Sequence, residues 1–335
     1  MKKNSKDYAD MQKDEVKHLT QQGDAHYKLR RLEEALSLYD QALSLGPTYA
    51  PAHSGKGYVR LRQEHYDEAL SFYDQALSLD PTYAPAYKGK GDVFLNRKRF
   101  DEALSCYDQA LCSNAHYALA YCGKSYTLVK LKRFDEALTA IDQALSLDPH
   151  NAFFYGNKGN VLCDLKRFNE ALLAYDQAHT LDPHDVFIHY CKGDVLKELK
   201  RFNEALTAYG QALSLDPHNA FFYGNKGHVL KELKRYDEAL AAYDQALSLD
   251  PHDAHTYNNK GDILRKLKHY DEALAAYDQT ISLDPDYPLY ALASHYKKSI
   301  LNRVKVQGKA QKMPDRLLIG KESRFSVQKR PKRLE

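Results

Sequence analysis

The 335-residue sequence has few cysteines, no tryptophan and no long apolar run. Its five cysteines form no CxxC pair and follow no metal-ligand spacing, which predicts free thiols in a reducing compartment. Nowhere do about 18 apolar residues follow one another, so no membrane-spanning helix is expected. Residues 1–15 are charged without an apolar core, unlike a signal peptide. These absences together predict a soluble cytoplasmic protein.

Catalytic motifs are also missing from the sequence. It contains no glycine-rich phosphate loop, no GxSxG and no HExxH. Four histidines, each directly after a proline, recur every 34 residues, namely His150, His184, His218 and His252. One histidine per repeat is typical of solvated loops and gives a poor geometry for a metal site. We therefore expect no enzymatic activity, no cofactor and no bound metal.

What the sequence does contain is a repeat of 34 residues. Proline recurs on this spacing without insertion or deletion, at Pro47, Pro81, Pro149, Pro183, Pro217, Pro251 and Pro285. Such fixed self-similarity is the signature of stacked-repeat folds. It divides the chain into an N-terminal extension 1–15, eight repeats (16–49, 50–83, 84–117, 118–151, 152–185, 186–219, 220–253 and 254–287), a segment 288–304 and a tail 305–335.

Each repeat has the pattern of two amphipathic helices. In repeat two, 50–83, apolar residues lie at steps of three and four in both halves, and Pro81 ends the second half. Gly57 at position 8 and Ala69 at position 20 of this repeat remove bulk where the two helices would cross. Position 24 is tyrosine in every repeat except one, which has Ile141. One hairpin cannot bury this surface alone, so neighbouring hairpins must stack.

These residues resemble the tetratricopeptide repeat, with small residues at positions 8, 20 and 27, an aromatic residue at 24 and proline at 32. The resemblance covers residues 16–287 and implies an all-α fold, a right-handed superhelical α-solenoid of helix-turn-helix units. Position 7 departs from the family because it is lysine in seven repeats, with an amine that we expect to reach water. Residues 288–304 carry one more amphipathic pattern and are expected to form a capping helix.

The resemblance also implies a function. It implies a non-enzymatic scaffold for protein–protein interaction, which binds a peptide or protein segment in a concave groove lined by positions 2, 5, 6, 9, 12 and 13 of the first helices. The candidate binding residues on these positions are Phe153, Asn157, Asn160, Phe187, Tyr190, Asp194, Phe221, Asn225, His228, Asn259 and Asp262.

Three phenylalanines share position 2 in successive repeats, namely Phe153, Phe187 and Phe221. If they lie on the surface, they form an apolar patch of the kind that marks an interaction site. Alternatively, each phenylalanine tucks against the first helix of the adjacent repeat. The sequence leaves both alternatives open.

Asparagine recurs at position 6, as Asn157, Asn225 and Asn259, although Cys191 interrupts the series. This series resembles the asparagine ladder of O-linked N-acetylglucosamine transferase, where side-chain amides bond the backbone of a bound peptide. A side-chain amide has a donor and an acceptor that match a peptide unit. Alternatively, these residues are duplicated polar side chains that face solvent.

The carboxylate clamp of the family's chaperone-tail adaptors is not preserved. That clamp has lysine at position 5 and asparagine at position 9 of one repeat, asparagine at position 6 of the next, and then a basic pair. Lys88 fits the first step, but Asp92 and Gly123 replace the two asparagines, and Phe153 and Asn157 replace the basic pair. We therefore expect no capture of EEVD-type chaperone tails.

The C-terminal residues 302–335 carry 11 Lys and Arg against 3 Asp and Glu, a balance of +8. Self-repulsion and sparse apolar residues predict disorder over 305–335. An alternative function is nucleic-acid association through this tail alone, which is not the expected role because a solubilising tail has the same composition. A further alternative is a regulatory subunit of an enzyme on another chain.

Overall fold

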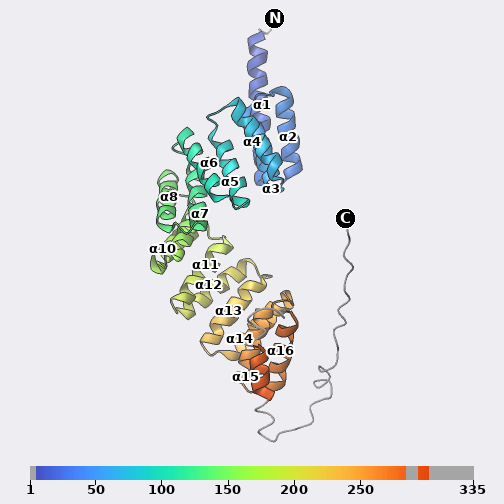
Figure 1. Cartoon of the computed structure of the whole chain (residues 1–335), viewed down its shortest axis with the longest axis vertical. Helices are drawn as coiled ribbons and strands as arrows, with labels where there is room; N and C mark the ends of the chain where they lie inside the picture. The colour runs from blue at the N-terminus through green and yellow to red at the C-terminus, as the bar shows by residue number, and fades with distance from the viewer. Residues whose placement is uncertain (1–4, 284–292, 302–335) are drawn as a thin grey trace, which may run out of the picture. The chain divides into compact units, whose positions relative to one another are not determined.

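The computed structural model describes residues 5–283 and 293–301 (Figure 1). This part of the chain is helical and has no strand. Its helices are α1 (Ser5–Lys28), α2 (Leu32–Leu45), α3 (Ala50–Arg62), α4 (Tyr66–Leu79), α5 (Ala84–Asn96), α6 (Phe100–Ser113), α7 (Ala118–Lys130), α8 (Phe134–Leu147), α9 (Ala152–Asp164), α10 (Phe168–Leu181), α11 (Val186–Glu198), α12 (Phe202–Leu215), α13 (Ala220–Glu232), α14 (Tyr236–Leu249), α15 (Ala254–Lys266) and α16 (Tyr270–Leu283). The expected all-α repeat fold is confirmed.

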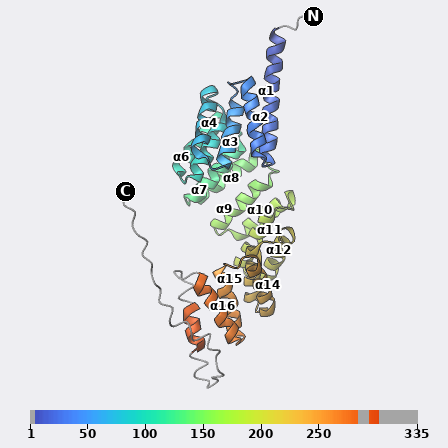
Figure 2. The same cartoon turned by 90° about the vertical axis from the view of Figure 1, so that its right-hand side faces the viewer.

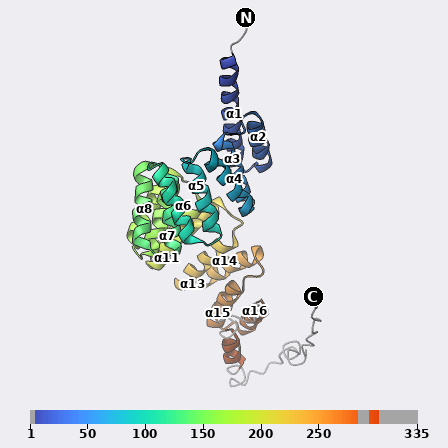
Figure 3. The ribbon, with the colours of Figure 1, turned by 45° about the horizontal axis from the view of Figure 1, so that its top comes forward.

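The chain divides into two compact units, Met1–Gln211 and Ala212–Glu335, and the division falls inside α12. In each unit, an odd-numbered helix pairs with the next even-numbered one as a hairpin, and hairpins stack on their neighbours. Figure 3 shows this in the N-terminal unit, where α5, α6, α7 and α8 lie side by side. We call the odd-numbered helix of each repeat its first helix and the even-numbered one its second.

In seven of the eight repeats, the core of the hairpin is a tyrosine against a glycine. The Tyr73 ring of α4 is fully buried, and a Cβ atom added to Gly57 of α3 would lie only 2.6 Å from it. Alanines at 69 and 76 complete the contact because their small side chains let the helices approach closely. The same pairing recurs in repeat five, where Tyr175 faces Gly159.

In the turn between the paired helices, one residue adopts the left-handed backbone conformation, although that residue is not glycine. In repeat five, Lys166 has φ 58°, and lysine, arginine or glutamate takes the same conformation at this position in every repeat. Two backbone bonds close the turn, from the Arg167 amide to the Leu162 carbonyl and from the Lys166 amide to the Cys163 carbonyl, each 2.8 Å. This is the Schellman arrangement, which satisfies carbonyls that the end of a helix leaves unpaired.

Replacing Lys166 with glycine is expected to raise the free energy of unfolding by about 1 kcal/mol, because a side chain makes the left-handed conformation costly. Urea denaturation of the full chain measures this change. Lys166→Ala is the matched control, since it removes the lysine side chain but keeps the Cβ atom. Equal stabilisation by both variants would contradict the explanation from backbone strain.

Lysine at position 7 does more than reach water, which differs from our expectation. Its amine pairs with the position-25 aspartate of the preceding repeat in the pairs Lys56–Asp40, Lys90–Asp74, Lys124–Asp108, Lys158–Asp142, Lys192–Asp176 and Lys260–Asp244, at 2.5 to 2.8 Å. The aspartates are about half exposed, so each pair contributes about 0–1 kcal/mol. These pairs connect the second helix of one repeat to the first helix of the next.

The two ends of the array add helical structure to the repeats. Helix α1 has 24 residues, and it runs without a break from the N-terminal extension into repeat one. Residues 293–301 are also helical, and Figure 2 shows them beside α16. Ala293 and Ile300 are buried against Leu274 and Tyr277 of α16. The rest of the expected capping helix, 288–292 and 302–304, lies outside the described residues, as does the basic tail 305–335.

Candidate functional site

Three of the large apolar side chains that remain exposed are phenylalanines on first helices. In the N-terminal unit, Phe153 of α9 is 63% exposed and Phe187 of α11 is 53% exposed, while in the C-terminal unit Phe221 of α13 is 59% exposed. All three occupy position 2 of their repeats. We call positions 2, 6 and 9 of the first helices the first-helix face.

Capping side chains at the start of these helices position the phenylalanines. The Asn151 side chain accepts the Phe154 amide at 3.3 Å, and the Asp185 carboxylate accepts the Phe187 amide at 2.8 Å. Such caps fix where a helix begins and therefore which side chains face its neighbours. As a result Phe154 is 1% exposed in the core, although Phe153 immediately before it lies on the surface.

Two exposed residues of the N-terminal unit join this face although we did not select them as candidates. Leu119 is 44% exposed at position 2 of α7, and Tyr126 is 46% exposed at position 9 of the same helix. The Lys130 amine lies 4.8 Å from the centre of the Tyr126 ring. An apolar residue at position 2 in the repeat before Phe153 was the available sequence signal. The apolar series in this unit is therefore Leu119, Phe153 and Phe187.

The asparagines at position 6 bond to their own helices. In α9, the Asn157 amide nitrogen donates to the Phe153 carbonyl at 2.9 Å. In α13, Asn225 donates to the Phe221 carbonyl at the same distance. Within the described part of the chain, the side-chain oxygens of Asn157 and Asn225 accept no hydrogen bond, so they can still accept one from a ligand.

Asn259 of α15 differs from the other two asparagines. Its side-chain oxygen accepts a 2.7 Å bond from the Lys231 amine of α13. Burial lowers the pKa of Lys231, and the nearby Asp262 carboxylate opposes that shift. Asn259 therefore links two first helices of the C-terminal unit, and its oxygen is already in use.

Most acidic and amide residues at position 9 serve the core. Each accepts a hydrogen bond from the hydroxyl of the position-24 tyrosine in its own repeat, with 2.7 to 2.9 Å between the two oxygens. The pairs are Tyr39–Asp24, Tyr107–Asp92, Tyr175–Asn160, Tyr209–Asp194 and Tyr277–Asp262. Three predicted binding residues, Asn160, Asp194 and Asp262, are thus held by buried tyrosines. They border the first-helix face, but part of their bonding capacity is taken.

Tyr190 and His228, the remaining candidates, are partly buried. The Tyr190 ring packs 6.3 Å from Phe187 and 6.3 Å from Tyr209, measured between ring centres. Burial and the neighbouring Asp194 carboxylate raise the pKa of the Tyr190 hydroxyl, which stays neutral at physiological pH. Tyr190 therefore packs against Phe187 and helps to hold its ring in place. His228 occupies position 9, as Asp194 does, one repeat later in the sequence.

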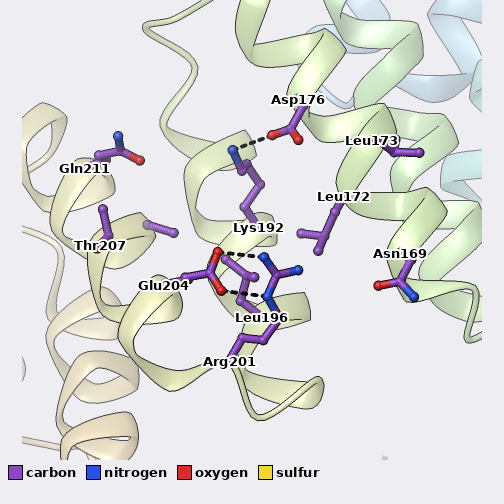
Figure 4. Close-up of a pocket in the computed structure, with 11 residues that line it drawn as sticks. Asn169, Leu172, Leu173, Asp176, Lys192, Leu196, Arg201, Glu204, Thr207 and Gln211 are labelled. Carbon is purple, nitrogen blue, oxygen red and sulfur yellow. Dashed lines mark hydrogen bonds and ion pairs between the residues drawn. The ribbon is translucent and has the colours of Figure 1, made fainter.

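A hollow in the N-terminal unit lies between α10, α11 and α12 (Figure 4). It encloses about 560 Å³ and is lined by Leu172, Leu173 and Leu196 among others. Its charged side chains already pair with each other, as Asp176 with Lys192 and Glu204 with Arg201, both at 2.6 Å. The hollow therefore has no net charge to select a ligand.

The described residues contain no helix long and apolar enough to cross a membrane. In the same part of the chain, His, Cys, Asp and Glu side chains form no group of three or more that could hold a metal ion. The five cysteines are free, and burial raises the pKa of Cys122 and Cys191, each to about 12. Both thiols are therefore protonated at physiological pH, a poor state for nucleophilic chemistry.

Comparison with known families gives one consistent result. Models of the tetratricopeptide repeat match residues 20–84, 60–121, 118–151, 190–254 and 225–288, and a model described as TPR repeat matches 159–200. No curated protein matches the chain. The matched ranges together span nearly all of the eight repeats.

Solved structures of low sequence identity share the fold. A chain of the APC/C hetero-tetramer Cut9–Hcn1 matches with a TM-score of 0.62 and 18% identity, over 84% of this chain and 55% of that one. This chain thus spans about half the length of that protein. Pseudomonas aeruginosa pilF matches with a TM-score of 0.56 and 21% identity, over 65% of this chain and 99% of that one. A thermophilic TPR protein of Thermus thermophilus matches with a TM-score of 0.50 and 21% identity, over 54% of this chain and 98% of that one.

Proposed function

Because the chain belongs to the tetratricopeptide repeat family, whose fold serves as a scaffold for protein–protein interaction, we propose that its first-helix face binds a peptide or protein segment in a concave groove. In this proposal the chain itself has no catalytic activity. Phe153, Phe187 and Phe221 are the apolar anchors. The side-chain oxygens of Asn157 and Asn225 accept backbone amides of the bound segment.

One observation carries the proposal, namely the exposure of the phenylalanines at position 2. They are 53 to 63% exposed, whereas the next residues along the chain, at position 3, are buried. Exposed aromatic side chains at the same position of successive repeats are costly in water unless a partner covers them, and aromatic residues are enriched among the anchors of protein interfaces. The asparagine oxygens add polar groups that can align an extended backbone.

Replacing Phe153, Phe187 and Phe221 together with serine is expected to weaken peptide binding by about thirtyfold or more, because the loss of buried aromatic anchors costs about 2 kcal/mol or more. A displayed peptide library selected against the full chain supplies the probe. Fluorescence anisotropy of the labelled peptide then gives Kd for wild type and variant.

Leu173→Ser is the matched control for this substitution. Leu173 is 66% exposed on α10, a second helix, so it undergoes the same apolar-to-polar change away from the first-helix face. We expect wild-type Kd for this control and unchanged helix content by circular dichroism for all variants. Equal loss of binding in the control, or loss of helix in the triple variant, would contradict the proposed anchors.

A further inference from the structure

Two histidines meet where repeats five and six stack. The rings of His179 in α10 and His189 in α11 lie edge to face, with 4.8 Å between their centres and an angle of 66°. His179 occupies position 28, which is leucine in six other repeats and isoleucine in one. The polar contact therefore replaces an aliphatic one at this stacking interface alone.

The hydrogen-bond partners of His189 fix its neutral tautomer. His189 is 3% exposed, and its Nε2 lies 3.2 Å from the Pro183 carbonyl. A carbonyl only accepts, so Nε2 carries the hydrogen and Nδ1 has a bare lone pair. The Nδ1 atoms of both His179 and His189 are buried, and neither has a hydrogen-bond partner among the described residues.

Repeat two contains a natural comparison. His53 occupies position 4, like His189, and its Nε2 lies 2.9 Å from the Pro47 carbonyl. The residue at position 28 of the repeat before it is Leu43 instead of histidine. A histidine at position 4 is thus compatible with an aliphatic neighbour, and the second histidine is what sets the fifth and sixth repeats apart.

We propose that the His179–His189 contact is an acid-sensitive joint between repeats five and six, which weakens when the His179 ring takes up a proton. A proton on Nδ1 would have no acceptor in this buried contact, and an unpaired buried charge is costly. Packing of α10 on α11 therefore favours a neutral His179 ring.

The charges of the two ionisable side chains near the His179–His189 pair oppose each other. Asp176, one turn before His179 on α10, favours its protonation, and Lys192, one turn after His189 on α11, opposes it. These two side chains pair with each other at 2.6 Å. Burial, the His189 ring and Lys192 lower the pKa of His179, and only Asp176 raises it. A neutral His179 ring is therefore the state that the folded chain favours.

The sign of the pH effect follows from this direction. In the unfolded chain a histidine titrates near its ordinary pKa of about 6.5, whereas His179 in the folded chain titrates lower. Between these two values the unfolded state binds more protons, so stability rises with pH. The stabilisation is fully present above about pH 6.5 and is lost as pH falls through the folded pKa of His179.

Hydrogen exchange of the full chain at pH 7.5 and pH 5.5 tests the proposal, and it needs no peptide ligand. After correction for intrinsic rates, amide exchange in α10 and α11 is expected to be faster at the lower pH, by up to about tenfold, because pH 5.5 lies about one unit below the ordinary histidine pKa at which the unfolded chain titrates. In His179→Leu, which restores the aliphatic residue of the other repeats, the change is expected to be less than twofold.

Two further variants separate the pair from the other histidines. His189→Tyr introduces the residue found at position 4 in five repeats, and it is expected to reduce the acid response as His179→Leu does. His53→Tyr makes the same change in repeat two and is expected to keep the full response. An undiminished response in His179→Leu, or a response reduced equally by His53→Tyr, would overturn the proposal.

Discussion

Replacing Gly159 with alanine is expected to lower the free energy of unfolding by about 1–3 kcal/mol. A Cβ atom at this position of α9 would lie 2.4 Å from the Tyr175 ring, which is closer than real contacts allow. Tyr175 is 1% exposed and packed on all sides, so the ring cannot move away without disturbing the core. The better helix propensity of alanine offsets only part of this cost.

Gly210→Ala is the matched control for this prediction. Gly210 also lies within a helix, α12, but a Cβ atom there would meet nothing within 4 Å. The same substitution is therefore expected to stabilise the chain by about 0.5–1 kcal/mol through helix propensity alone. Urea denaturation of both variants should give shifts of opposite sign. Shifts of the same sign would show that the contact between glycine and tyrosine does not govern the cost.

Tyr107→Ala is expected to have the largest effect, a loss of about 3–5 kcal/mol, because it removes a large buried ring and leaves a cavity. Tyr107 is fully buried in α6, and Gly91 and Gly123 both lie against its ring. The ring thus packs on the first helix of its own repeat and on that of the next. Urea denaturation measures the loss.

The tyrosine hydroxyls allow a finer comparison. The Tyr107 hydroxyl donates to Asp92 at 2.9 Å, so Tyr107→Phe is expected to cost about 1 kcal/mol. The Tyr73 hydroxyl is buried and has no partner among the described residues, because Tyr58 occupies position 9 in that repeat. Tyr73→Phe is therefore expected to leave stability unchanged or raise it. A cost as large as that of Tyr107→Phe would show that the Tyr73 hydroxyl has a favourable partner.

The repeat period made most of the fold predictable. Gly57 and Tyr73 stand at fixed positions of one 34-residue pattern, and the structure places them in contact. The left-handed turns were not predictable in the same way, because Lys166 and its equivalents give no glycine or asparagine signal. Tertiary packing of two helices sets that conformation, and local preference does not reveal it.

The candidate site was predictable only in part. Sequence placed Phe153 on a helix but left open whether it is exposed, since this depends on how the Asn151 cap orients the first turn. The position-9 residues Asn160 and Asp194 appeared available for a ligand. Their bonds to buried tyrosines come from side chains 15 residues further along, and only the closed hairpin brings them together.

The close contact between tyrosine and glycine affects which repeats can stack on each other during folding. Similar hairpins share one apolar pattern, so a folding chain could stack a hairpin on the wrong neighbour. Gly55 leaves room for the Tyr39 ring of the preceding repeat, and any Cβ atom there would lie 2.5 Å from it. Repeat five has Asn157 at that position and follows a repeat with Ile141 in place of tyrosine. Repeat five therefore could not replace repeat two unless the Tyr39 ring moved, so repeats one and two fit each other more closely than repeats one and five would.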